Sequence, residues 1–208
     1  MKFILYILVL SVFYSCSAPK PEQSHDEMKL KFDSAWKADS SGKWKTTRTE
    51  LAASSQRNEY SLYCRSWLLA QNGNLAKAIK TADSLVMGFP AFVKGYYLRA
   101  NLRADAKDLE GAFGDFDKAI KRDPVFFEAL MNRGSLHFSN QHPDLALKDF
   151  QLARKIQSTD PEVFTNLGNS WLALGKADSA CKSWENAQTL GSKKAVDLLN
   201  RFCQQTGK

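Results

Sequence analysis

The chain has 208 residues, 44% of them hydrophobic and 25% charged, which is enough apolar material for one folded domain. Its formal net charge of +7 could favour acidic surfaces, but the basic residues are scattered, as is typical of a solvated helical surface. This scatter, together with the export signal described next, argues against a nucleic-acid-binding function.

Residues 1–15 are expected to be a cleaved signal peptide. A lysine follows the initiator methionine, and an apolar run then covers residues 3–14. Such a run is too short to span a bilayer as a permanent helix, which needs about 20 residues. A charged start and a short apolar region are typical of a secretory signal.

Residues 13–16, with the sequence FYSC, resemble the bacterial lipobox, in which a small residue precedes the cysteine that is lipidated and becomes the mature amino terminus. Phe13 and Tyr14 are bulkier than the usual residues. The resemblance implies a lipoprotein whose acyl chains on Cys16 give stable anchoring, since each buried methylene contributes about 0.8 kcal/mol. The alternative is an ordinary secretory signal with an incidental cysteine.

Residues 16–27 then read as a flexible tether, because the segment from Ser17 contains two prolines and no apolar run. Cleavage after residue 15 would remove one lysine and leave a mature charge of +7 − 1 = +6. Residues 28–58 have the spacing of two amphipathic helices around a turn at 40–42. We interpret residues 28–58 as a degenerate repeat or an amino-terminal helical cap.

Four units of equal length follow in one register, each 34 residues after the last. The units are 59–92, 93–126, 127–160 and 161–194. Small residues occupy the eighth place (Ser66, Ala100, Gly134, Gly168) and alanine the twentieth (Ala78, Ala112, Ala146, Ala180). The twenty-fourth place carries Ala82, Phe116, Phe150 and Trp184.

Within each unit, apolar residues recur three and four apart in two blocks, which predicts two amphipathic helices. Small residues at the eighth and twentieth places would let the two helices approach closely, with the aromatic residue filling the space beside their contact.

This pattern resembles the tetratricopeptide repeat over roughly two-thirds of the chain. The departures are arginine at the seventh place of three units (Arg65, Arg99 and Arg133), Ala82 in place of an aromatic residue, and the absence of the late proline in the last two units. The resemblance implies an all-α solenoid of stacked helix pairs, a right-handed superhelix with a concave, partner-binding face.

The segment 195–208 is predicted to form a helix that covers the last unit, since Leu198, Leu199 and Phe202 share one face. If the chain folds back near residue 191, Cys181 and Cys203 could become neighbours and form a disulfide in an oxidising compartment. The alternative is two buried free thiols.

Few residues suggest chemistry. His137 and His142 flank a turn, and no further residue is spaced to complete a metal site with them. Asp115 and Asp117 are expected to be solvated surface charges. No nucleophile elbow, phosphate-binding glycine loop or zinc-protease motif is present. We therefore expect neither a cofactor nor an enzymatic activity.

The resemblance to the repeat family implies which residues line the concave face. These are Tyr60, Tyr63, Trp67, Tyr97, Asn101, Met131, Phe138, Thr165, Asn169 and Leu172. Aromatic anchors beside amides suit the capture of a peptide or partner helix, although half of these residues could equally pack against adjacent helices.

The sequence thus predicts a non-catalytic scaffold, anchored by lipid in the bacterial envelope, on the outer membrane and facing the periplasm. Its partner would be a protein or peptide, and two copies could also pair. The alternative is an accessory lipoprotein that binds glycan or peptidoglycan through the aromatic-rich first repeats.

Overall fold

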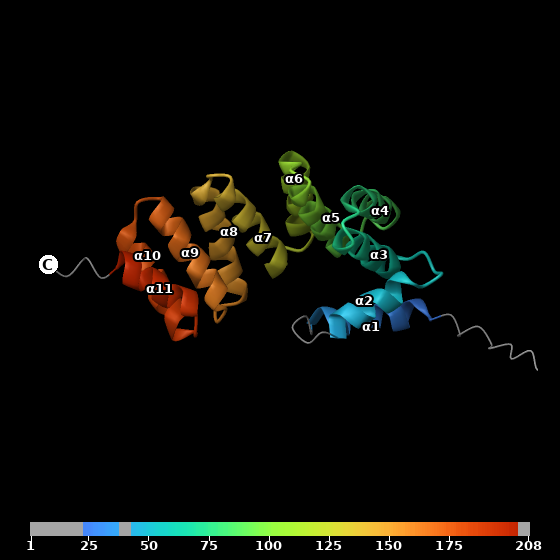
Figure 1. Ribbon diagram of the computed structural model, residues 1–208, viewed down its shortest axis with the longest axis horizontal. Helices are drawn as coiled ribbons and strands as arrows, with labels where there is room; N and C mark the ends of the chain where they lie inside the picture. Colours follow the sequence, from blue (N-terminus) through green and yellow to red (C-terminus); the bar gives the residue numbers. More distant parts are fainter. Residues whose placement is uncertain (1–22, 38–42, 204–208) are drawn as a thin grey trace, which may run out of the picture.

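The computed structural model describes residues 23–37 and 43–203. Within them the chain forms eleven helices and no strand, so the all-α solenoid expected from the sequence is confirmed (Figure 1). The helices are α1 (His25–Lys37), α2 (Lys43–Ala52), α3 (Glu59–Gln71), α4 (Leu75–Gly88), α5 (Val93–Asp105), α6 (Leu109–Arg122), α7 (Phe127–Ser139), α8 (Pro143–Ile156), α9 (Pro161–Ala173), α10 (Ala177–Thr189) and α11 (Lys193–Phe202).

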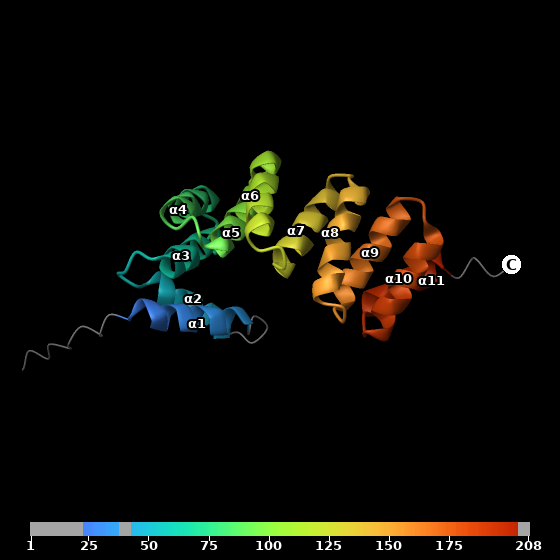
Figure 2. The same ribbon diagram turned by 180° about the vertical axis from the view of Figure 1, so that it is seen from behind.

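From α3 onward the helices stack in chain order along the long axis of the molecule, while α1 and α2 lie beneath α3 at one end (Figure 2). Each of the four 34-residue units contains one antiparallel pair, from α3 with α4 to α9 with α10. The expected signal peptide, Cys16 and residues 17–22 of the expected tether lie outside the described residues.

The folded part begins earlier than the tether boundary at residue 27 suggests. Helix α1 begins at His25, and the Ser24 hydroxyl accepts a hydrogen bond from the Glu27 amide at 3.2 Å. This serine supplies the first-turn partner that a helix otherwise lacks, and two acidic residues in the same turn favour the helix dipole. Likewise α11 begins at Lys193, two residues before the expected cap.

Each unit turns between its two helices at a residue with positive φ in the fifteenth place. Glycine occupies this place in the first and fourth units (Gly73, φ 76°, and Gly175, φ 74°), and Lys107 (φ 65°) and Gln141 (φ 64°) occupy it in the middle two. Glycine adopts this conformation without steric cost, so the middle turns are the more strained.

The small residues at the eighth place lie against the aromatic residues at the twenty-fourth. A Cβ atom added to Gly168 would overlap the indole of Trp184, and one added to Gly134 would lie 2.8 Å from Phe150 Cε1. Trp184 and Phe150 are almost fully buried. The close crossing therefore depends on the absence of a side chain at these two glycines.

The expectation that Asp115 and Asp117 are solvated charges is wrong for Asp115. Its side chain is 1% exposed, and both of its oxygens accept hydrogen bonds at 2.7 Å from Arg99 on the neighbouring helix. Asp117 is 65% exposed but bonds Arg133 at 2.6 Å. Asp115 shares the buried face of α6 with Ala112, Phe116 and Ala119, and its charge is paired there by an arginine of α5.

The arginines at the seventh place join consecutive units. Arg99 bonds Asp115 of its own unit and Asp83 of the preceding one, the latter at 2.8 Å. One repeat later, Arg133 bonds Asp149 and Asp117 in the same way. For Arg99, burial alone would lower the guanidinium pKa, but its bonds to the two carboxylates outweigh burial and raise it.

The amino-terminal helices add an aromatic cluster to the first units. Phe32 of α1 is fully buried, with ring centroids 5.1 Å from Tyr63, 5.2 Å from Tyr60 and 5.8 Å from Phe92. Helix α2 packs against α3. The region 28–58 is therefore a helix pair built into the start of the array.

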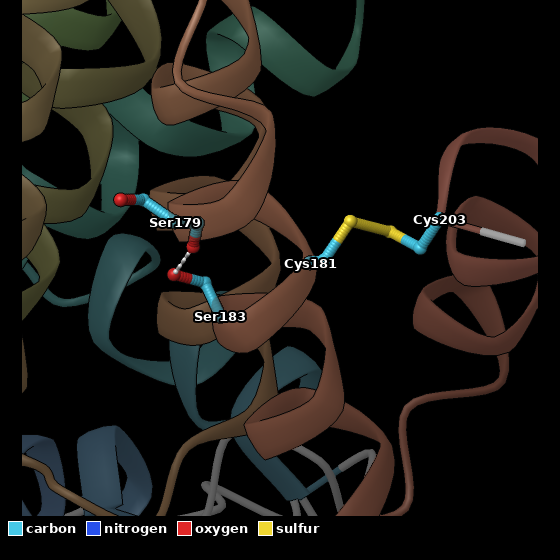
Figure 3. The surroundings of a disulfide bond; sticks show 4 residues. All are labelled: Ser179, Cys181, Ser183 and Cys203. Atoms are coloured by element: carbon cyan, nitrogen blue, oxygen red, sulfur yellow. Dashed lines mark hydrogen bonds between the residues drawn. A yellow bond between two sulfur atoms is a disulfide. The ribbon is translucent and has the colours of Figure 1, made fainter. Parts of the chain in front are cut away.

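A disulfide joins Cys181 of α10 to Cys203 at the end of α11, with the Cα atoms 5.8 Å apart (Figure 3). Beside it, the Ser183 hydroxyl donates to the Ser179 carbonyl oxygen at 2.8 Å. Cys64 is a free, buried thiol, and burial raises its pKa to about 12.

Candidate functional site

A cavity of about 310 Å³ lies where the first helices of three units face the amino-terminal helices. Its lining comes from α1 and α2 (Trp36, Arg48), α3 (Tyr63, Trp67, Ala70, Gln71), α5 (Tyr97, Leu98, Asn101, Leu102, Asp105) and α7 (Glu128, Asn132). We call it the inner cavity. Two carboxylates, one guanidinium and two asparagine amides share it with four aromatic rings, so it can accept both apolar and hydrogen-bonding groups.

Aromatic side chains form the walls of the inner cavity. The Arg48 guanidinium lies 3.8 Å from the centre of the Trp67 ring, a cation–π contact that also fixes the arginine at the rim. The Tyr97 ring centroid lies 5.1 Å from that of Phe126, in a tilted contact, and 5.9 Å from that of Trp36, in an edge-to-face contact. These rings are held by neighbours from several helices, and the walls are therefore preformed.

An amide network crosses the floor from α5 to α7. The Asn132 side-chain nitrogen donates to the Asn101 oxygen at 2.9 Å and lies 3.1 Å from the Tyr97 hydroxyl. The Asn101 nitrogen in turn donates to the Tyr97 backbone carbonyl at 2.9 Å. The Asn132 side-chain oxygen and one Asn101 N–H are not used by these bonds, so the network can bond a peptide while keeping its own geometry.

Trp36 of α1 reaches across the array to the third unit. Its indole nitrogen donates to a Glu128 carboxylate oxygen at 3.3 Å, joining residues 92 positions apart in the chain. A second cavity, of about 420 Å³, lies on the far side of this contact, and Trp36 and Glu128 line both. The end of α1 therefore contributes to the lining of both cavities.

Four of the residues expected on the concave face come together in the inner cavity: Tyr63, Trp67, Tyr97 and Asn101. Tyr60 instead lies in the aromatic cluster with Phe32 and is 5% exposed. Burial raises its hydroxyl pKa to about 12, with the charge of Glu59 adding to the effect. Tyr63, although it lines the cavity, is only 3% exposed.

The other five expected residues lie elsewhere. Met131 is buried in the core shared by the last two units, and Phe138 is 38% exposed near the end of α7. On α9, Thr165 is buried and bonds the Pro161 carbonyl oxygen at 2.8 Å. Leu172 packs into the cluster around Trp184, and Asn169 is half-buried.

Sequence reasoning did not place Trp36, Arg48, Asp105 or Glu128 at the site. The repeat register identified candidate residues only on the first helix of each unit. It gave no role to the two helices that precede the first unit. Glu128 stands at the second place of its unit, as Tyr60 does, and this shared place was the one available signal for it.

Within residues 23–37 and 43–203, no three histidine, cysteine or acidic side chains are grouped so as to hold a metal ion. His137, considered as a ligand, stacks on Phe113 with ring centroids 4.4 Å apart. No helix in the same residues is both long and apolar enough to cross a bilayer.

A search of curated proteins found no match. Among solved structures, MamA resembles the fold with a TM-score of 0.62, at 18% identity over 78% of this chain and 96% of MamA. A fragment of MamA from Desulfovibrio magneticus RS-1 gives a TM-score of 0.64, at 18% identity over 70% of this chain and 84% of the fragment. A thermophilic TPR protein from Thermus thermophilus gives 0.62, at 18% identity over 84% and 96% of the two chains.

At 18% identity, the similarity to these solved structures supports the fold alone. The tetratricopeptide repeat family profile matches the sequence itself, in two overlapping segments, 65–124 and 97–161. These segments include the helices that contribute Arg99, Arg133 and the amide network. Residues 65–161 are therefore tetratricopeptide repeats, and the chain has the fold of a tetratricopeptide repeat solenoid.

Proposed function

We propose that this protein is a non-catalytic scaffold, anchored by lipid at Cys16 in the bacterial envelope, that binds a protein segment in the inner cavity. The observation that carries the proposal is the cavity itself, in which three repeat units present preformed aromatic walls and an amide network. An extended or helical peptide satisfies both features, placing an apolar side chain beside Trp67 and backbone groups over Asn101 and Asn132.

Envelope location is supported by two features far apart in the chain. The amino terminus has the pattern of a lipoprotein signal ending at Cys16. At the other end, Cys181 and Cys203 form a disulfide, and such bonds persist in oxidising compartments such as the periplasm.

Site-specific photocrosslinking tests whether a protein partner binds in the inner cavity. A photoreactive residue in place of Asn101 should yield a discrete crosslinked partner in envelope extracts, and the same residue in place of Met87 should not. Met87 is 80% exposed on α4 and does not line the inner cavity, which makes it a matched surface control.

The crosslink should also depend on the aromatic wall. Trp67→Ala removes the ring under Arg48 and should reduce the yield about tenfold, the effect of losing roughly 1.4 kcal/mol of binding free energy. Tyr63 is a poor choice here, because its burial makes loss of folding the first effect of its removal. Equal crosslinking yields from the wild-type protein and Trp67→Ala would refute the proposal that the partner binds in the inner cavity.

Lipid anchoring is tested by intact-mass measurement on membrane-extracted protein. The expected mature chain begins at a diacylated or triacylated Cys16, and Cys16→Ser should abolish both the lipid mass and the membrane association. A mature chain that starts at any other residue contradicts the proposed lipid anchor, but it has no bearing on partner binding in the inner cavity.

The glycan alternative relied on aromatic residues of the first repeats. Two of them, Tyr60 and Tyr63, are buried against Phe32, which leaves fewer rings to stack on a sugar. The structure therefore favours a protein partner. Sedimentation with purified cell-wall sacculi discriminates between the two, since only a glycan-binding protein should sediment.

A further inference from the structure

A second cavity-bearing face of the first unit is strongly cationic. A hollow of about 400 Å³ between α3 and α4 shares no lining residue with the inner cavity. Its lining consists of Arg57, Leu62, Arg65, Leu69, Lys77, Lys80, Thr81 and Ser84. Four of these eight residues are cations and none is acidic, so the hollow concentrates positive charge.

Comparison with the next two units shows what this hollow lacks. In them the arginine at the seventh place is bonded by an aspartate of its own unit, 16 residues on, and by one of the preceding unit. Arg65 is the arginine at the same place in the first unit, 34 residues before Arg99. The residue 34 positions before Asp115 is Thr81, and the residue 34 positions before Asp83 is Thr49.

Arg65 therefore has neither aspartate. Its guanidinium donates instead to the backbone carbonyl oxygens of Ala52 and Ser54, at 3.3 and 3.2 Å. These neutral acceptors hold the arginine in position but leave its charge uncompensated. Both bonds use the same terminal nitrogen, Nη2, so the Nε–H and the two N–H groups of Nη1 remain for an anion, which the positive guanidinium attracts.

The other three cations reinforce this charge. Arg57, Lys77 and Lys80 are exposed, and over residues 23–37 and 43–203 no carboxylate forms an ion pair with them or with Arg65. Arg99, by contrast, has two carboxylate partners.

We propose that this hollow is a binding site for a phosphate-class oxyanion, which occupies the place that two aspartates fill in each of the next two units. Arg65 bonds the anion, and Lys77, Lys80 and Arg57 surround it. The site is independent of the partner binding proposed for the inner cavity.

Two sources can supply the phosphate: a free anion or a lipid headgroup. His25 bonds the Glu59 carboxylate at 3.0 Å, so the chain enters the fold at the start of α3, two residues from Arg57. His25 lies nine positions after Cys16 (25 − 16 = 9), a span of at most about 30 Å. With the proposed anchor in place, a bilayer surface is therefore within reach of the hollow.

The test introduces the missing carboxylate by substitution in the protein itself. In the full chain, Thr81→Asp puts an aspartate where Asp115 stands relative to Arg99, so it should occupy the site. Titration with inorganic phosphate, followed by NMR of the Arg65 side chain and the Ser84 amide, should show about tenfold weaker binding in this variant. Its thermal unfolding temperature should not fall, because the new carboxylate pairs with Arg65.

A matched control removes one cation from a different basic face. Lys148, with Arg154 and Lys155, lines a separate hollow on α8. Lys148→Gln should leave the phosphate affinity unchanged, whereas Lys80→Gln should lower it. Absence of phosphate binding to the wild-type chain, or equal weakening by Lys148→Gln and Thr81→Asp, overturns the proposal.

Vesicles distinguish the two sources. Full-chain protein is compared on phosphatidylcholine vesicles and on vesicles that also contain phosphatidylglycerol. If the lipid headgroup is the ligand, the anionic lipid should protect α4 from hydrogen exchange in the wild type but not in Thr81→Asp. If free phosphate is the ligand, phosphate should protect α4 and the lipid should not. If neither phosphate nor the anionic lipid protects α4, the proposed anion site is wrong, whatever the crosslinking at the inner cavity shows.

Discussion

At the scale of single residues, the buried arginine–aspartate pairs carry the largest expected effects. Asp115 accepts two bonds from Arg99 and a third from Arg103 at 2.8 Å, and its side chain is almost fully buried. Asp115→Asn should lower the free energy of unfolding by about 3 kcal/mol, because it removes the buried counter-ion that two guanidinium groups share and leaves them only the more exposed Asp83 and Asp108. Urea denaturation measures the change.

Asp117→Asn is the matched control. It removes a carboxylate from the same helix, but Asp117 is 65% exposed and Arg133 keeps its bonds to Asp149. Its cost should be about 1 kcal/mol or less. Similar costs for the two variants would mean that burial does not govern the strength of these bridges.

The glycine at the crossing of the last unit gives a steric prediction. Gly168→Ala should lower the free energy of unfolding by about 1–3 kcal/mol, since the new methyl group overlaps the Trp184 indole. Gly114→Ala, in α6 where nothing lies within 4 Å of the added methyl, should instead be neutral or stabilising by up to about 1 kcal/mol. Thermal unfolding of both variants provides the measurement.

His137 should make the protein less stable in mild acid. Burial, the largest cause, lowers the pKa of His137 below its usual 6.5, although Asp149 acts in the opposite direction. As the pH falls through about 6.5, the unfolded chain therefore takes up a proton that the folded chain resists, and stability is lost. His137→Phe, which can still stack on Phe113, should reduce the loss between about pH 7 and about pH 5.

The measurement is the free energy of unfolding of both proteins at the two pH values. The comparison uses the difference between the two pH values, so a constant change in stability caused by the larger ring cancels. An identical pH dependence in the variant would show that His137 does not contribute to it.

At the scale of elements, the disulfide holds α11 on the end of the array. Replacing both Cys181 and Cys203 by alanine should lower the free energy of unfolding by roughly 3 kcal/mol, because the bond closes a loop of sequence separation 22. Amide hydrogen exchange of α11 should rise most.

A reducing agent supplies the control. It should destabilise the wild-type protein to the level of the double variant and leave the variant itself unchanged. Cys64 is a free thiol in both proteins, so any effect through it would appear in both. A reductant effect on the variant would contradict the assignment.

The local regularity of the elements is what made them predictable. Small and aromatic residues at fixed places, such as Gly168 with Trp184, describe contacts inside one helix pair, and such contacts repeat with the sequence. Asp115 lies on the buried face of α6, but its partner Arg99 belongs to another helix, so the sequence of α6 alone does not show how the buried charge is paired.

At the scale of the whole molecule, Trp36 connects the amino-terminal pair to the third unit. Trp36→Ala should raise hydrogen exchange throughout α1, because that helix loses its contact with Glu128 and with the rings of Tyr63 and Tyr97. Leu30→Ala is the control, since Leu30 is 72% exposed on the same helix. Exchange of α9 to α11 should be the same in both, and equal exchange of α1 in both variants would contradict the role of Trp36.

The candidate site was predictable only in part for the same reason. The repeat register led to Trp67, Tyr97 and Asn101, which line the inner cavity. It could not lead to the contact between Trp36 and Glu128, because that contact joins a non-repeating helix to a repeat 92 positions away. Charge partners and contacts between distant helices become visible only in the folded chain.

The arginine bridges have a consequence for how such a chain can change its length. Asp83 and Asp117 stand 34 residues apart, and each bonds the arginine of the following unit. If residues 93–126 were lost in frame, Asp83 would fall where Asp117 now stands and would meet Arg133. The arginine–aspartate bridge between the middle units is therefore the same at each boundary, so a middle unit can be duplicated or deleted without a further substitution to restore the bridge. It is not so at the carboxyl end, where Leu167 replaces the arginine, and growth there would need a new connector.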